Sequence, residues 1–120
     1  MTVVNLINVA TITPVMAAGA VTTSRVSIVD VAADKVAKIN SLIIANIDGT
    51  NAADVTVEVS TDDGVTYVPI AKDVSVPSDE SLVVVSKDSG FYLDETDILA
   101  VTASAASDLT YLVSYELMTD

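Results

Sequence analysis

The chain has no histidine, no cysteine and no tryptophan among its 120 residues. The absence of cysteine excludes disulfide bonds and thiolate metal sites. The absence of histidine removes the side chain that enzymes use most often as a general base. Serines such as Ser24, Ser41 and Ser104 have no histidine partner, and no lysine spacing indicates a Ser–Lys pair. We therefore expect a protein that is not an enzyme and that binds no cofactor.

Basic residues are also scarce. Five lysines and arginines stand against 17 aspartates and glutamates, which gives a net charge of −12. Such a chain repels phosphate backbones and anionic lipid surfaces, so direct binding to nucleic acid or to a membrane is not expected. The acidity either keeps an apolar protein soluble or attracts a basic partner.

Charge is absent altogether from residues 2–24. Polar residues and a proline interrupt this stretch, so it does not predict a membrane-spanning helix. It also lacks the basic start of a signal peptide. A β-strand followed by a turn is the expected structure.

Large aromatic side chains are few, whereas valine occurs 21 times and threonine 13 times. β-branched residues favour the pleated surface of a sheet. Short apolar runs alternate with turn signals at residues 14–19, 48–49, 62–64, 77–79 and 88–90. This pattern predicts one all-β domain over residues 1–120, an antiparallel β-sandwich of jelly-roll or immunoglobulin-like type with about eight or nine strands. The expected strands are residues 3–13, 21–31, 37–47, 54–61, 65–71, 81–86, 90–93, 98–104 and 109–118.

One hairpin can be assigned a register from the sequence. If Asp63-Gly64 forms a two-residue turn, Val59 faces Val68, Val57 faces Ile70 and Glu58 faces Pro69. Proline cannot donate a ladder hydrogen bond, so the second strand is expected at a sheet edge. The consecutive apolar residues 42–45 predict a central strand, and residues 82–85 are similar; either run could instead expose one face to a partner subunit.

Two further groups of residues have alternative interpretations. The acidic cluster Asp94, Glu95 and Asp97 could bind calcium, but turn formation by Asp is the favoured interpretation and no metal site is predicted. Among the tyrosines, Tyr92 and Tyr115 are expected to plug the ends of the sandwich. Tyr67 is expected to be exposed on the hairpin, where it can contact a partner.

Residues 36–116 resemble small β-sandwich virion structural proteins of tailed bacteriophages, of the head decoration or cement type and the neck or tail accessory type. The matching residues are Lys38 to Leu42, Ala45-Asn46, Asp48-Gly49, Pro77, Ser81-Leu82, Lys87, Tyr92-Leu93, Asp97 and Ser114 to Glu116. The chain has Thr96 where the pattern leads us to expect glycine, which argues against a positive φ at that position.

The resemblance implies a capsid decoration protein on the virion head that binds the major capsid protein and forms a homo-oligomer, expected to be a trimer. A neck or tail accessory subunit is an alternative within the same class. A host-surface glycan-binding module is an alternative from another class, although the scarcity of aromatic rings disfavours a sugar platform.

The uncharged first strand is the expected contact with partners, and residues 1–35 form either an arm that reaches a neighbouring subunit or two more strands. The predicted interface residues are Val3, Val4, Leu6, Ile7, Val9, Ile12 and Tyr67.

Overall fold

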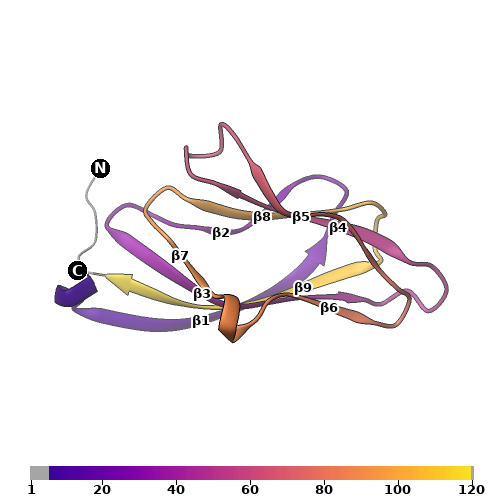
Figure 1. Cartoon of the computed structure of the whole chain (residues 1–120), viewed down its shortest axis with the longest axis horizontal. Coiled ribbons are helices and arrows are strands. Elements are labelled where there is room, and N and C mark those ends of the chain that lie inside the picture. Colours follow the sequence, from indigo (N-terminus) through magenta and orange to yellow (C-terminus); the bar gives the residue numbers. More distant parts are fainter. Residues whose placement is uncertain (1–5, 120) are drawn as a thin grey trace.

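The computed structural model describes residues 6–119, which form two antiparallel sheets packed face to face (Figure 1). The first sheet has the strand order β1-β9-β3-β6, with β7 also paired to β3. The second sheet has the order β2-β8-β4-β5. This arrangement of two four-stranded paths is that of a jelly roll, so the predicted all-β sandwich is confirmed.

The strands in the described part of the chain alternate with short turns and two single-turn 3₁₀ helices. The elements are η1 (Leu6–Asn8), β1 (Thr11–Val21), β2 (Val26–Asp30), β3 (Lys35–Asn46), β4 (Ala53–Ser60), β5 (Val68–Val76), β6 (Ser81–Val85), η2 (Lys87–Ser89), β7 (Phe91–Leu93), β8 (Ile98–Ala103) and β9 (Leu109–Thr119).

The first strand lies later in the chain than the sequence predicted. Residues 14–19 were expected to form a turn, but they lie in the middle of β1, which pairs with β9 without interruption from Thr11 to Val21. Pro14 is tolerated because β1 is an edge strand. Gly19 lies opposite Tyr111, whose ring would be 3.1 Å from an added Cβ, so the tyrosine covers the position that glycine leaves empty.

Residues 11–30 therefore belong to the two sheets as β1 and β2. Within the described chain, only residues 6–10 precede the first strand, and the predicted contacts Val3 and Val4 lie outside the described residues.

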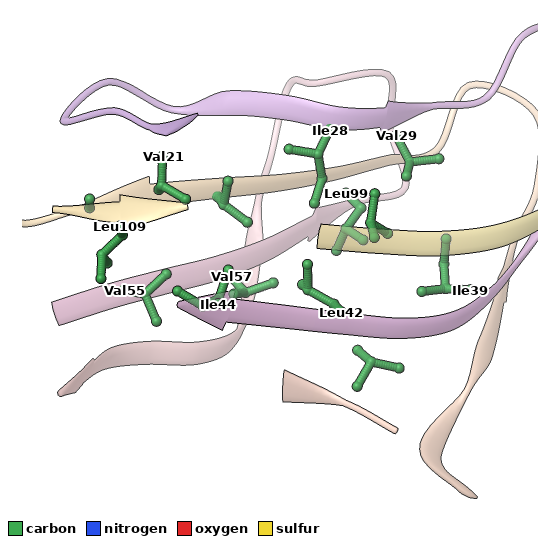
Figure 2. Close-up of a cluster of buried hydrophobic side chains, with 14 of the residues drawn as sticks. Val21, Ile28, Val29, Ile39, Leu42, Ile44, Val55, Val57, Leu99 and Leu109 are labelled. Carbon is green, nitrogen blue, oxygen red and sulfur yellow. The ribbon is translucent and has the colours of Figure 1, made fainter. Parts of the chain in front are cut away.

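Aliphatic side chains fill the space between the sheets, as the composition predicted (Figure 2). Three neighbouring positions on β1, β9 and β3 show the pattern: Ala17, Val113 and Leu42 share a row that points inward. The largest fully buried apolar side chains are Ile39, Leu42, Ile44, Leu93, Leu99 and Leu109. Tyr115 packs against this core as predicted, whereas the prediction for Tyr92 is wrong because its side chain is 53% exposed.

The β4–β5 hairpin keeps part of the predicted register. Val59 pairs with Val68 and Glu58 with Pro69, and β5 is an edge strand as Pro69 indicated. A register shift then pairs Val57 with Ala71 instead of Ile70. The extra residue leaves Ile70 48% exposed, so the apolar side of β5 is not wholly buried.

The two remaining apolar strands differ in their position. β3 is central, as predicted, because β9 flanks it on one side and β6 and β7 on the other. β6 lies at the edge, and Val83 is 56% exposed, so its apolar run is covered on one face only.

The turn between β4 and β5 is longer than two residues because side chains hold it. Asp63 and Gly64 have φ values of 59° and 85°, which fits the predicted turn chemistry. The Asp62 carboxylate accepts hydrogen bonds from the Thr66 N–H and the Ser60 hydroxyl, both at 2.8 Å. These bonds lower the pKa of Asp62, with the Thr66 N–H as the largest cause.

We expect Asp62→Asn to be less stable than the wild type at pH 7, and the difference in melting temperature to shrink as the pH falls below about 4. A lowered carboxylate pKa contributes stability above the unfolded pKa, and this contribution is lost as the pH falls through the folded pKa. Thermal unfolding of both proteins between about pH 2.5 and about pH 7 measures this, since these limits lie roughly one unit or more on either side of the ordinary pKa of Asp. A constant difference across this range would contradict the assignment.

The start of β7 depends on a close backbone approach. A Cβ at Gly90 would lie 2.7 Å from the carbonyl oxygen of Ile39, within the segment of β3 that pairs with β7. We expect Gly90→Ala to lower the free energy of unfolding by about 1–3 kcal/mol, because a backbone atom cannot move aside as a side chain would. Urea unfolding measures this, and Gly49→Ala, whose Cβ would have no neighbour closer than 3.7 Å, is the control.

Thr96 adopts a left-handed backbone with φ 67°, so the expectation against a positive φ is wrong. The surrounding chain fixes this conformation. The Thr96 N–H donates to the carbonyl of Val31 at 2.8 Å, and the Val31 N–H donates to the carbonyl of Asp97 at 3.0 Å. Such a pair of backbone bonds holds a residue in a conformation that its own preference opposes.

Candidate interaction surfaces

The outward side of the first sheet presents uncharged residues in rows that cross several strands. The central row consists of Ala18, Leu112, Ile43 and Val83, which are successive partners on β1, β9, β3 and β6. We call this row and the two beside it the neutral face; its residues are Met16, Ala18, Ala20, Ser41, Ile43, Ala45, Ser81, Val83, Thr110, Leu112 and Ser114.

A shallow depression of about 440 Å³ lies in the neutral face. Its lining includes the small residues Ala18 and Ala45 and the larger Ile43 and Leu112. Met16 is 70% exposed and Val83 is 56% exposed at opposite margins of the face. This relief of small and large apolar groups suits the packing of another protein surface.

The charges of the described chain lie elsewhere. The outer side of the second sheet carries Asp54, Glu58 and Asp73, and Arg25 pairs with Glu58 at 3.1 Å. Along the first sheet, charge returns one row beyond Ser41 and Ser114, where Lys38 pairs with Glu116. In a protein with a net charge of −12, an uncharged outer sheet face is therefore a local exception.

Acidic loops border the far end of the neutral face. Hydrogen bonds from the N–H groups of Thr50 and Asn51 lower the pKa of Asp48. Desolvation, followed by the charge of Asp48, raises the pKa of Asp108. Two carboxylates thus lie close to each other at this end, which adds negative potential to the rim and leaves the face itself neutral.

A second apolar surface lies at one flank of the sandwich, between β5 and β7. It is an open groove of about 350 Å³, and we call it the flank groove. Exposed fractions of 61% for Val68, 48% for Ile70 and 53% for Tyr92 show how much apolar surface it leaves to solvent. Its lining residues are Val59, Thr61, Val68, Ile70, Phe91, Tyr92, Leu93 and Asp97.

The sequence located only part of these surfaces. Leu6 and Ile7 lie in η1 with exposed fractions of 46% and 91%, and Ile12 on β1 is 57% exposed. Val9 is half-buried between them. Leu6, Ile7 and Ile12 are thus exposed, and their role in an interface stays a prediction. Ile43 and Val83 belong to the two apolar runs for which an exposed face was left open, whereas Leu112 was not named.

Tyr67 is half-buried and not fully exposed as expected. The Arg25 guanidinium lies 3.8 Å from the centre of its ring and also contacts Glu58. This stack covers one face of the tyrosine, so Tyr67 holds the hairpin against the start of β2.

The acidic cluster forms a turn. The Asp94 N–H donates to the Asp97 carboxylate, and the Glu95 N–H donates to Asp94 Oδ1, both at 2.8 Å. Glu95 is 2% exposed, and its Oε2 accepts from the Asp34 N–H at 2.8 Å. Within residues 6–119, no three His, Cys, Asp or Glu side chains converge as metal ligands.

No helix in this part of the chain is long and apolar enough to cross a membrane.

No protein-family model matches the chain, and no curated protein matches its sequence. Solved structures do match its fold. A subunit of the disulfide-linked pili of Bacillus endospore appendages is 16% identical, with a TM-score of 0.53 over 91% of this chain and 87% of that one. At this identity the likeness establishes the fold alone, and the pilus disulfides have no counterpart here because the chain lacks cysteine.

Two structures of pentameric capsid proteins from metagenomic phage sequences also match over 96% of this chain. They are 18% and 19% identical, with TM-scores of 0.41 and 0.39. The alignments cover 67% and 62% of the capsid chains, which are therefore longer than this protein.

Proposed function

We propose that this protein is a non-enzymatic structural subunit of a phage virion that decorates the capsid and binds the major capsid protein through the neutral face. The observation that carries the proposal is the uncharged row of Ala18, Leu112, Ile43 and Val83 across the first sheet. The resemblance of residues 36–116 to virion decoration proteins supports the choice of partner.

The mechanism is adhesive. A solvated sheet face normally carries polar side chains. When a partner covers an apolar face instead, the free energy of the complex falls because apolar surface is removed from water. A contact of standard size buries roughly 1,600 Å² in total, and repetition over a symmetric shell multiplies its effect. The acidic loops around Asp48 and Asp108 then lie at the rim, where they favour basic patches on the shell and disfavour other surfaces.

Mixing the purified protein with undecorated phage heads, at low and at high salt, tests the proposal. We expect sedimentation with the heads under both conditions, because an apolar contact resists salt, and a modest loss at high salt as the acidic rim is screened. Failure to bind at both salt concentrations would rule out the decoration role.

A neck or tail accessory subunit would use the same apolar face against a different partner. The number of copies in each virion separates the two roles. Decoration predicts hundreds of copies, whereas a closed neck ring predicts about a dozen or fewer. Quantitative mass spectrometry of purified virions measures this number.

A further inference from the structure

We infer that the flank groove of one copy binds the N-terminal segment (residues 6–12) of a second copy, which links the subunits head to tail. This contact between copies does not depend on the capsid role, and purified protein alone tests it. Residues 6–12 read Leu-Ile-Asn-Val-Ala-Thr-Ile and carry no charge.

The distribution of exposed apolar side chains supports the pairing. Of the ten exposed large apolar side chains in residues 6–119, Leu6, Ile7 and Ile12 lie in the segment. Val68, Ile70 and Tyr92 lie in the groove. The remaining four are divided among the neutral face and two loops, so these two places hold most of the exposed large apolar side chains on the flanks.

The groove has room for apolar side chains of the segment. It is an open concavity of about 350 Å³ between β5 and β7, and the segment leads directly into the edge strand β1. A volume at the lower end of the range for binding pockets suits a few aliphatic side chains better than a large ligand.

The two surfaces lie on opposite flanks of the same molecule. The segment is anchored to the first sheet by the Ala10 N–H, which donates at 2.9 Å to the carbonyl of Thr119, the last residue of β9. β9 and β3 lie between β1 and β7 in this sheet (Figure 1). A contact between unlike surfaces on opposite flanks repeats from copy to copy. It gives a ring, such as the trimer that the resemblance implies, when the rotation between copies closes, and an open filament when it does not.

Charge favours this route of association over others. Two copies with a net charge of −12 repel wherever their acidic surfaces face each other. An uncharged segment in an apolar groove brings two copies together without placing like charges next to each other. The one carboxylate among the described residues that line the groove, that of Asp97, already accepts a hydrogen bond from the Asp94 N–H at 2.8 Å.

Light scattering coupled to gel filtration gives the first test. We expect the wild type to be larger than a monomer, and Leu6→Asp and Ile70→Asp each to weaken association at least about tenfold, because a charge is buried against apolar side chains. Ile47→Asp adds the same charge at another exposed position, 63% exposed, and should leave association unchanged. A monomeric wild type would overturn the inference.

Disulfide crosslinking gives a second test that does not depend on loss of function, and the absence of native cysteine makes it unambiguous. We expect oxidised dimers when Leu6→Cys protein is mixed with Ile70→Cys protein, but not when Leu6→Cys is mixed with Ile47→Cys. Crosslinking of Leu6→Cys to itself as efficiently as to Ile70→Cys would contradict the head-to-tail contact. A crosslink formed only within the Leu6→Cys/Ile70→Cys double variant, as a monomer, would also overturn it.

Discussion

Leu112→Asp is expected to reduce binding to undecorated phage heads by about a hundredfold or more. Leu112 lies at the centre of the neutral face, where Ala18 and Ile43 are its partners on either side. A carboxylate at this position must lose its water when the shell covers it, and no basic residue of the neutral face can pair with it. Quantitative sedimentation with heads over a range of protein concentrations gives the affinity.

The matched control is Ser27→Asp, which introduces the same charge on β2, an exposed position of the second sheet. We expect its affinity to remain within about threefold of the wild type, because an exposed surface substitution has little effect on energy. Leu112→Thr keeps the β-propensity and removes apolar area, so it should give an intermediate loss. Equal binding by Leu112→Asp and Ser27→Asp, with both proteins folded by circular dichroism, would exclude the neutral face as the contact.

Asn46→Asp is expected to lower the free energy of unfolding by about 3–4 kcal/mol at pH 7. Asn46 is 3% exposed at the end of β3, and its amide nitrogen donates to the carbonyls of Val76 at 2.9 Å and Asn51 at 3.0 Å. Its amide oxygen accepts the Asp48 N–H at 2.8 Å. The side chain thus ties the first sheet to β5 of the second sheet and to the connecting loop.

An aspartate has nearly the same shape, but it places a carboxylate oxygen against two carbonyl oxygens in a buried position. Asn46→Ala removes the same bonds without this repulsion and should cost about 2–3 kcal/mol. Asn51→Ala removes a 3.4 Å hydrogen bond from an exposed side chain in the same loop and should cost less than about 0.5 kcal/mol. Urea unfolding of the three variants measures these costs, and an Asn46→Asp protein as stable as Asn51→Ala would refute the prediction.

Local chemistry was sufficient where one strand determines the outcome. Pro69 indicated an edge strand because proline has no N–H to donate. The run from Leu42 to Ala45 indicated a central strand, and β3 is central in its sheet, although only one of its faces is buried. The hairpin register was correct next to the turn and failed beyond it. The register shift that exposes Ile70 has no signal in the sequence of β5.

Pro14 and Gly19 predicted a turn that does not form, because both residues are turn signals as well as residues that an edge strand tolerates. Their strand exists because β9 supplies a partner for eleven consecutive residues and because Tyr111 covers Gly19. In the same way, Thr96 takes a left-handed backbone because Val31, on another segment, accepts from the Thr96 N–H and donates to the carbonyl of Asp97. Distant parts of the chain overrode local preference at each of these positions.

Composition was enough to predict the class of fold and the character of the core, since a chain rich in valine and threonine and poor in large aromatics favours sheets packed over small aliphatic groups. Which apolar residues stay outside depends on how the strands pair. Ala18, Ile43, Val83 and Leu112 belong to four separate strands, and each resembles many core residues of the chain. Only the registers of β1, β9, β3 and β6 place them in one outward row, because side chains alternate between the two faces and a shift of one residue would turn any of them inward.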